Sequence, residues 1–411
     1  MPAWGMSLSG RRVWWLLGSA GAGNLADGIG KVAFPLLATT ITRDPVQIGA
    51  LSATQFVPWL LLGTVAGALV DRVDRRRAML LANAARAVLV LGTAVLLWSG
   101  ALSIWLIYLV ALLLGAAETV AESAVNAVIP AVAEGGRLEQ ANSRFQAAEI
   151  LGQTFLGGPL GSATFALFAT LPFLLSSAGF AIAAALLLGM AGSYRPRAPA
   201  NPTRLRTDLA DGLRWLARNP LLLRLVLVAG LISVTSELAQ AQLVLYALED
   251  LRLSEAAFGV FSFVGGLGGL AGAAAAPWLV RRTGRTSVLV GGILAGGLGF
   301  LAMGLIRHSV AAAVCFGVFA AAVVAVNVVL ATARHALVPG ELLGRVLGAW
   351  RTVVWGAVPV GALLGGALTR LAGHASTTFV ISGLAQVALA GLTVLLVRGF
   401  TLGETVEPSR A

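Results

Sequence analysis

The sequence predicts an all-α integral membrane protein, with twelve transmembrane helices in two pseudo-symmetric six-helix bundles. Three observations carry this prediction: the composition, the length of the apolar runs and a repeat between the two halves. Of the 411 residues, 58% are hydrophobic and 11% are charged. A soluble domain carries about 25% charged residues. Since a bilayer removes the need for a polar surface, the composition indicates a membrane protein.

Twelve runs are long enough to cross the hydrocarbon core, which needs ~20 mainly apolar residues per helix. They are too long and too free of charge to be membrane β-strands of ~10 alternating residues. The predicted spans are 13–41, 47–70, 78–98, 102–129, 143–168, 171–193, 221–247, 255–280, 286–306, 309–333, 346–371 and 375–397.

The first run has an alternative interpretation, because Arg11 and Arg12 followed by "VWWLLGSAGA" are also typical of a short signal peptide. Apolar character continues through "KVAFPLLATTI", which favours an uncleaved first helix. Arginine is concentrated in every second loop, and such loops face the cytoplasm. This pattern predicts a multi-pass protein of the bacterial inner membrane with both termini in the cytoplasm. It also explains the net charge of +11 without nucleic-acid binding.

The longest polar segment, 194–220, separates a predicted N-terminal bundle (1–193) from a C-terminal bundle (221–398) and a short tail (399–411). Within it, 207–218 is predicted to form a helix capped by Thr207, either on the inner membrane face or solvated. The halves repeat: "GALVDRVDRRRAMLL" at 67 and "PWLVRRTGRTSVLV" at 277 are 210 residues apart, so Arg75 corresponds to Arg285. Paired six-helix halves around a midplane cavity are typical of transporters.

The stretch Gly67-Ala-Leu-Val-Asp71-Arg72-Val-Asp74-Arg75-Arg76 resembles the loop motif between helices 2 and 3 of the major facilitator superfamily. "GNLADGIGKVAFPLL", "GLRWLARNPLLLRL" and "ALVPGELLGRVLG" are similar to the superfamily's drug-efflux branch of macrolide and enterobactin exporters. The resemblance covers nearly the whole chain. It implies a secondary active transporter that works by alternating access and exports amphiphilic small molecules, with proton antiport as the expected energy source.

Two departures weaken the resemblance to proton-coupled exporters. The helix 4 sequence "YLVALLLGAAETVAESA" lacks the arginine that many of them carry. In helix 5, Gly158, Pro159 and Gly161 only approximate their glycine-proline motif. Two alternatives therefore stay open: an importer or lipid-type substrate carrier of the same fold, and a non-transporting membrane receptor or scaffold.

No P-loop, HExxH or GxSxG sequence is present, so we expect neither ATP-driven transport nor an enzyme. Cys315 is the single cysteine, which excludes an intramolecular disulfide and any multi-cysteine metal site. We expect no metal and no cofactor. The expected partners are a small-molecule substrate, protons and the lipid bilayer, and the expected state is a monomer that binds no nucleic acid.

An ionisable side chain within the bilayer is costly unless it faces a cavity or a partner. Asp27 lies near the middle of the first span, with Lys31 one turn later and Asn24 three residues earlier on the same face. We interpret Asp27 as a proton or substrate site at which Lys31 and a proton compete. The alternative is a static Asp27–Lys31 ion pair that locks the helix.

Glu118 and Glu122 are one turn apart in the fourth span, and two like charges this close favour a proton on one of them. Glu122 is predicted to form a cytoplasmic gate with Arg144 or Arg351; the alternative is a permanent structural pair. The remaining candidates for proton or substrate contact are Glu149, Glu237, Gln240 and Asn327.

The motif between helices 2 and 3 has two possible roles. Its arginines hold the loop in the cytoplasm, which requires neither Gly67 nor Asp71. The resemblance further implies a conformational latch, in which Asp71 contacts the start of helix 11 and nearby basic residues. The predicted latch and gate residues are Gly67, Asp71, Arg72, Arg75, Arg144, Arg285 and Arg351.

Overall fold

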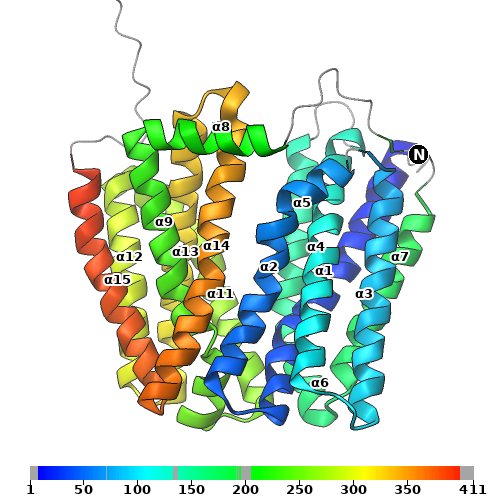
Figure 1. The fold of residues 1–411 in the computed structure, drawn as a ribbon, viewed down its shortest axis with the longest axis horizontal. Helices are drawn as coiled ribbons and strands as arrows, with labels where there is room; N and C mark the ends of the chain where they lie inside the picture. Colours follow the sequence, from blue (N-terminus) through cyan, green and yellow to red (C-terminus); the bar gives the residue numbers. More distant parts are fainter. Residues whose placement is uncertain are drawn as a thin grey trace, which may run out of the picture. The chain divides into compact units, whose positions relative to one another are not determined.

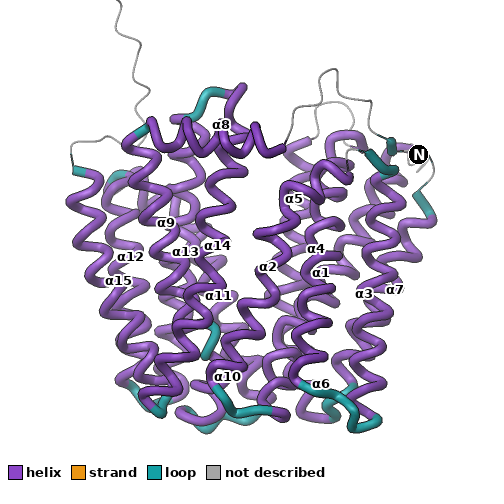
Figure 2. Tube along the Cα trace, in the orientation of Figure 1, coloured by secondary structure: helices purple, strands orange, loops and turns teal. Residues whose placement is uncertain are grey.

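The computed structural model describes residues 8–70, 72–132, 138–190, 192, 194, 195 and 205–398. In these ranges the chain forms helices joined by short loops and contains no strand, which confirms the all-α class (Figures 1 and 2). The helices are α1 (Leu8–Ile41), α2 (Pro45–Val70), α3 (Arg75–Trp98), α4 (Ile104–Val132), α5 (Leu138–Glu149), η1 (Ile150–Gly157), α6 (Gly158–Leu167), α7 (Leu171–Leu188), α8 (Leu205–Arg218), α9 (Pro220–Gln240), α10 (Leu243–Leu245), η2 (Tyr246–Asp250), α11 (Glu255–Thr283), α12 (Arg285–Leu305), α13 (Ser309–Leu337), α14 (Gly340–Ala372) and α15 (Ala375–Val397).

Among the described residues, nine helical segments are long and apolar enough to cross a membrane. They are Arg75–Trp98, Ile104–Ile129, Leu171–Leu188, Pro220–Asp250, Glu255–Thr283, Arg285–Leu305, Ser309–Leu337, Arg345–Ala372 and Ala375–Val397. Each of the nine overlaps one predicted span. The other three predicted spans are occupied by α1, by α2 and by the run α5–η1–α6. The chain is thus a multi-pass helical membrane protein, while the number twelve stays a prediction.

The chain folds into two compact units. Unit 1 comprises residues 1–43, 54–202 and 254–263, and unit 2 comprises 44–53, 203–253 and 264–411. The first residues of α2 therefore belong to unit 2, and those of α11 belong to unit 1. These two segments correspond to each other in the 210-residue repeat, since α2 begins at Pro45 and α11 at Glu255.

Each unit has an apolar core contributed by several helices. In unit 1, Leu16, Met79, Val128 and Leu187 are buried together from α1, α3, α4 and α7. The core of unit 2 draws on α9, α12, α13, α14 and α15 through Leu225, Leu289, Val329, Trp350 and Leu389. Many apolar side chains on other helix faces are exposed, as Trp98, Trp105 and Leu167 are. Buried cores beneath apolar surfaces fit a protein whose solvent is lipid.

Helix α8 lies across the ends of α9 and α14 in unit 2 (Figure 1). Leu216 is buried in the unit 2 core, and the Asp211 carboxylate lies 3.6 Å from the Arg345 guanidinium of α14. A Cβ atom on Gly212 would collide with the backbone of Arg345. The segment is therefore packed against unit 2 along one face. Thr207 lies inside α8 and not at its start, so its predicted capping role is wrong.

The arginine-rich stretch after α2 forms hydrogen bonds with carbonyl groups near the ends of two helices in unit 1. Arg75 donates a hydrogen bond from Nη1 to the carbonyl oxygen of Ala127 near the end of α4, at 2.9 Å. Arg76 donates to the carbonyl oxygens of Leu187 and Leu188 at the end of α7, at 2.7 and 2.8 Å. Cations stabilise helix C-termini by pairing with the last carbonyl groups. These arginines thus have a structural role beside the topological one predicted from sequence.

Asp74 caps α3 and ties it to the chain beyond α7, so its removal is expected to destabilise unit 1. Its carboxylate accepts hydrogen bonds from the backbone N–H groups of Arg77 and Tyr194, both at 3.1 Å. Losing the cap and leaving the Tyr194 N–H unpaired costs about 1–3 kcal/mol. Asp74→Ala is thus expected to lower the Tm of the purified protein in detergent. Asp74→Asn retains one acceptor and is expected to lose less; an unchanged Tm in the alanine variant contradicts the capping role.

Candidate functional site

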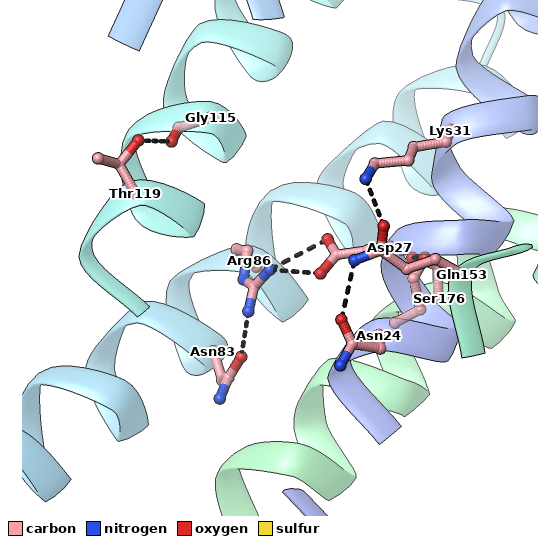
Figure 3. A network of polar contacts seen from close by, with 10 residues as sticks. Asn24, Asp27, Lys31, Asn83, Arg86, Gly115, Thr119, Gln153 and Ser176 are labelled. Atoms are coloured by element: carbon pink, nitrogen blue, oxygen red, sulfur yellow. Dashed lines mark hydrogen bonds and ion pairs between the residues drawn. The ribbon is translucent and has the colours of Figure 1, made fainter. Parts of the chain in front are cut away.

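A buried ion pair lies inside unit 1, between α1 and α3 (Figure 3). Arg86 Nη1 contacts both carboxylate oxygens of Asp27, at 3.0 and 2.9 Å. The side chains are only 6% and 16% exposed, respectively. Arg86 Nη2 also donates to Asn83 Oδ1 at 2.6 Å, and the guanidinium stacks 4.3 Å from the ring centroid of Phe180. Mutual neutralisation makes both charges tolerable inside a membrane.

The predicted Asp27–Lys31 pair is wrong, because Lys31 contacts a different helix. Its ammonium group donates to Gln153 Oε1 at 2.6 Å, and Gln153 Nε2 donates to Asn24 Oδ1 at 2.8 Å (Figure 3). Gln153 therefore links two polar residues of α1. Lys31 and Asn24 thus share Gln153, whereas the counter-ion of Asp27 is Arg86.

A π-helical segment brings Gln153 to α1. The run α5–η1–α6 changes from α- to π-helix at Ile150–Gly157, directly before Pro159, which lacks the N–H that a continuous α-helix needs. Helix α1 packs against this run along a row of glycines. A Cβ atom on Gly28 would lie 2.6 Å from Gln153 Cα, and one on Gly161 would lie 2.6 Å from the Ile29 carbonyl oxygen. The predicted helix 5 motif thus contributes to close packing, since Gly161 permits this approach.

Two cavities in unit 1 meet at the ion pair. The larger, of about 260 Å³, is lined by four acids, Asp27, Glu118, Glu122 and Glu149, and by one base, Arg86. Several amide side chains complete its polar wall. The smaller cavity, of about 70 Å³, is lined by Lys31, Gln55 and Ser176 and by several apolar residues. Asp27 and Glu118 line both cavities, so these two carboxyl groups stand where the cavities adjoin.

Glu118 differs from Asp27 in its surroundings. It is partly buried in α4 and has no hydrogen-bond or ion-pair partner among the described residues. The Arg86 guanidinium is already bonded to Asp27 and Asn83. A carboxyl group without a counter-ion in such a place favours the protonated form. Glu118 thus stands where the two cavities adjoin without an ion-pair partner of its own among the described residues.

The predicted Glu122–Arg144 gate is not formed. Arg144 of α5 places its guanidinium 5.7 Å from the ring centroid of Trp14 instead. Glu149 accepts a 3.5 Å hydrogen bond from Gln146 in the same helix, and both line the larger cavity. Arg351 belongs to unit 2, so its pairing with Glu122 stays a prediction.

In unit 2, Glu237 of α9 accepts a 2.5 Å hydrogen bond from the Ser52 hydroxyl. Gln240 is partly buried near the end of the same helix, and Asn327 of α13 is exposed. Arg351 is exposed on α14, and Arg285 is the first residue of α12. Arg72 is exposed in the loop after α2, whereas Asp71 and the surroundings of Gly67 lie outside the described residues. The latch interpretation thus stays a prediction.

Sequence reasoning missed Arg86, Asn83 and Gln153. A signal for Arg86 was available, since it is the single charged residue of the predicted span 78–98. Asn83 lies one turn before it on the same helix. Gln153 carried no such signal, because its position depends on the π-helical turn and on contacts with α1.

Comparison with known proteins agrees with the fold. A family model described as Major Facilitator Superfamily matches residues 16–336. The multidrug efflux pump Tap of Mycobacterium tuberculosis H37Rv is 27% identical over 395 residues, which cover 90% of this chain and 91% of the pump. YfiS of Bacillus subtilis 168, an uncharacterised MFS-type transporter, is 24% identical over 391 residues and 92% of each chain.

Solved transporter structures share the architecture at low sequence identity. A mutant of the nucleoside transporter NupG has a TM-score of 0.81 and 12% identity, covering 94% of this chain and all of NupG. An inward-facing, occupied bacterial homologue of the human lysosomal transporter Spinster has a TM-score of 0.73 and 15% identity, covering 94% and 96%. At these identities the likeness concerns the fold alone. The match over most of the chain, together with this fold, shows that the chain belongs to the Major Facilitator Superfamily of transporters.

Proposed function

We propose that the chain is a secondary active transporter that exports amphiphilic small molecules in exchange for protons by alternating access. The relatives support export, since Tap is named as a multidrug efflux pump and aligns over 90% of this chain. The arginine-rich loops support an inner-membrane location with both termini in the cytoplasm. The structural likeness to a nucleoside transporter at 12% identity favours no particular substrate.

The observation that carries the proposal is the position of Glu118. It lines both cavities of unit 1, beside an Asp27 that Arg86 already neutralises. We assign Glu118 as the group that binds the transported proton, and the larger cavity as the part of the substrate site that unit 1 contributes. In this proposal, the ion pair of Asp27 and Arg86 sets the electrostatic surroundings of Glu118 and does not bind the transported proton itself.

Coupling follows from competition at this cavity. With Glu118 ionised, a carboxylate without an ion-pair partner faces the cavity and favours the positively charged end of an amphiphile. A proton on Glu118 removes this charge and weakens that interaction. Substrate and proton then reduce each other's affinity by the same factor, as linkage requires. If proton and substrate do not bind at the same time, each crossing of the membrane carries one of them, and the transporter exchanges protons for substrate.

Proteoliposomes that contain the purified chain and an internal pH dye test this function. Ethidium is the first probe, followed by tetracycline and erythromycin. We expect addition of a transported compound, without an imposed gradient, to drive protons in the opposite direction, and protein-free liposomes to show no such flux. Proton movement in the same direction as the compound contradicts antiport and favours the importer; no flux with any of the three probes contradicts a proton-coupled exporter of amphiphiles.

A further inference from the structure

We propose that Glu237 is a second proton-binding carboxyl group, and that its protonation holds residues 44–53, which include the start of α2, against α9 and α14. The site lies in unit 2, apart from the network around Glu118. It extends the proposed proton coupling, but it rests on contacts of its own and is tested without transport.

The repeat between the halves identifies the site. Glu237 lies 210 residues after Asp27, the same spacing that relates Pro45 of α2 to Glu255 of α11 and the starts of α3 and α12. The two acids thus occupy corresponding positions in α1 and α9. At the same spacing, Gly296 stands in place of Arg86 and Ala241 in place of Lys31. The second half therefore has an acid without either cation of the first half.

The contacts of Glu237 agree with the lack of a neighbouring cation in the second half. Its carboxyl group takes a 2.5 Å hydrogen bond from Ser52 Oγ and has no ion-pair partner among the described residues. It lies near the middle of the apolar helical segment Pro220–Asp250. Helix α14 packs directly beside it, since a Cβ atom on Gly361 would lie 3.1 Å from Glu237 Cβ.

The surrounding contacts hold residues 44–53 in unit 2. Asp44 pairs with Arg370 of α14, and Gln242 Nε2 donates to the Pro45 carbonyl oxygen at 3.1 Å. A small buried cluster is formed by Ala53 of α2, Ala241 just after α9 and Ala362 of α14. The charge of Arg370 is thus balanced by Asp44. The residue of α2 that forms a hydrogen bond with Glu237 is Ser52.

The charge state of Glu237 decides whether this packing is favourable. A protonated carboxyl group is neutral and keeps a hydrogen bond with the Ser52 hydroxyl. An ionised carboxylate in the same place has no cation, and one hydroxyl hydrogen bond returns less than the lost hydration costs. Ionisation therefore favours a conformation in which residues 44–53 leave α9 and water reaches the carboxylate. Proton binding at Glu237 and closure of this contact stabilise each other.

Thiol protection measures the contact directly. In the full-length chain, Cys315→Ala removes the native thiol and Ala53→Cys places one in the buried cluster. The rate of maleimide labelling is followed over a pH series and divided by the rate for the denatured protein at each pH. We expect protection at acidic pH and an increase of up to about tenfold per pH unit above the midpoint, as one-proton linkage predicts. Glu237→Gln, which mimics the protonated form, is expected to stay protected throughout.

Two controls keep the test decisive. Glu249→Gln changes an exposed acid of unit 2 and should leave the pH profile unchanged. Ala241→Cys reports on the same cluster from the other side and serves if the first thiol disturbs folding. Protection that ignores pH, or a Glu237→Gln variant that titrates like its parent, overturns the proposal. Absent proton flux in proteoliposomes with pH-dependent protection retained would overturn the antiport function but not this site.

Discussion

Replacing Arg86 with glutamine is expected to destabilise the protein severely and to abolish proton-coupled transport. The change leaves the Asp27 carboxylate in a membrane-spanning helix without its counter-ion, at a site where the two side chains are mostly buried. Breaking a buried ion pair by removing one partner costs about 3–5 kcal/mol. It also removes the one basic side chain that lines the larger cavity beside Glu118. The measurements are the Tm in detergent and ethidium-driven proton flux in proteoliposomes.

The second mutation separates stability from transport. Asp27→Asn in the Arg86→Gln background removes the unpaired charge and is expected to recover much of the lost stability, because neither position of the former ion pair is then charged. Transport should stay impaired, since the charges around Glu118 have changed. Lys31→Gln is the control for removing a cation from the same network, and its stability loss should be much smaller because Lys31 is exposed. An Arg86→Gln variant as stable and active as wild type contradicts the assignment of the pair.

Adding one methyl group at Gly157 is expected to have the second largest effect. Its Cβ atom would lie 2.5 Å from the Cα of Gly28, a backbone position that cannot rotate away. Helix α1 and the π-helical segment must then separate, which pulls Gln153 from Lys31 and Asn24. Overpacking of this kind costs about 1–3 kcal/mol. We expect Gly157→Ala to lower the Tm and to reduce the fraction that elutes as a single monodisperse peak.

Gly21→Ala is the matched control, because it is the same chemical change on α1, the helix that Gly157 contacts at Gly28. No atom lies within 4 Å of the Cβ position at Gly21. Alanine is the better helix former by about 1 kcal/mol, so this variant should be as stable as wild type or slightly more so. Equal Tm values for Gly157→Ala and Gly21→Ala would show that the close approach at Gly28 is not required.

The fold could be predicted from the sequence because its dominant signals are local. Uninterrupted apolar runs fix where helices lie, and the 210-residue repeat relates α2 to α11 and α3 to α12. The π-helical segment could not be predicted. Pro159 shows that one backbone hydrogen bond of the α-helix is missing, but several conformations of the preceding turns are compatible with that loss. Thr207 was misplaced as a cap because α8 begins earlier, at Leu205, and a residue inside a helix cannot cap it.

The candidate site could be predicted only in part. An acid in the middle of a membrane helix is recognisable from sequence, so Asp27, Glu118 and Glu237 were identified. Their partners are set by packing between helices. Lys31 is one turn from Asp27, but it reaches Gln153 of another helix, whereas Arg86 comes from 59 residues away. Nearness along a helix therefore predicted the wrong counter-ion.

The role proposed for Glu118 is to bind the proton that is exchanged for substrate. Proteoliposomes with Glu118→Gln test it most directly, with Glu249→Gln as the acid-to-amide control outside the cavity. We predict that the Glu118→Gln protein still exchanges labelled for unlabelled ethidium across the membrane, since exchange needs no proton release. It should need a higher ethidium concentration, because glutamine has the charge of the protonated acid, and ethidium should no longer drive proton flux. Ethidium-driven proton flux at the wild-type rate in Glu118→Gln would contradict the claim.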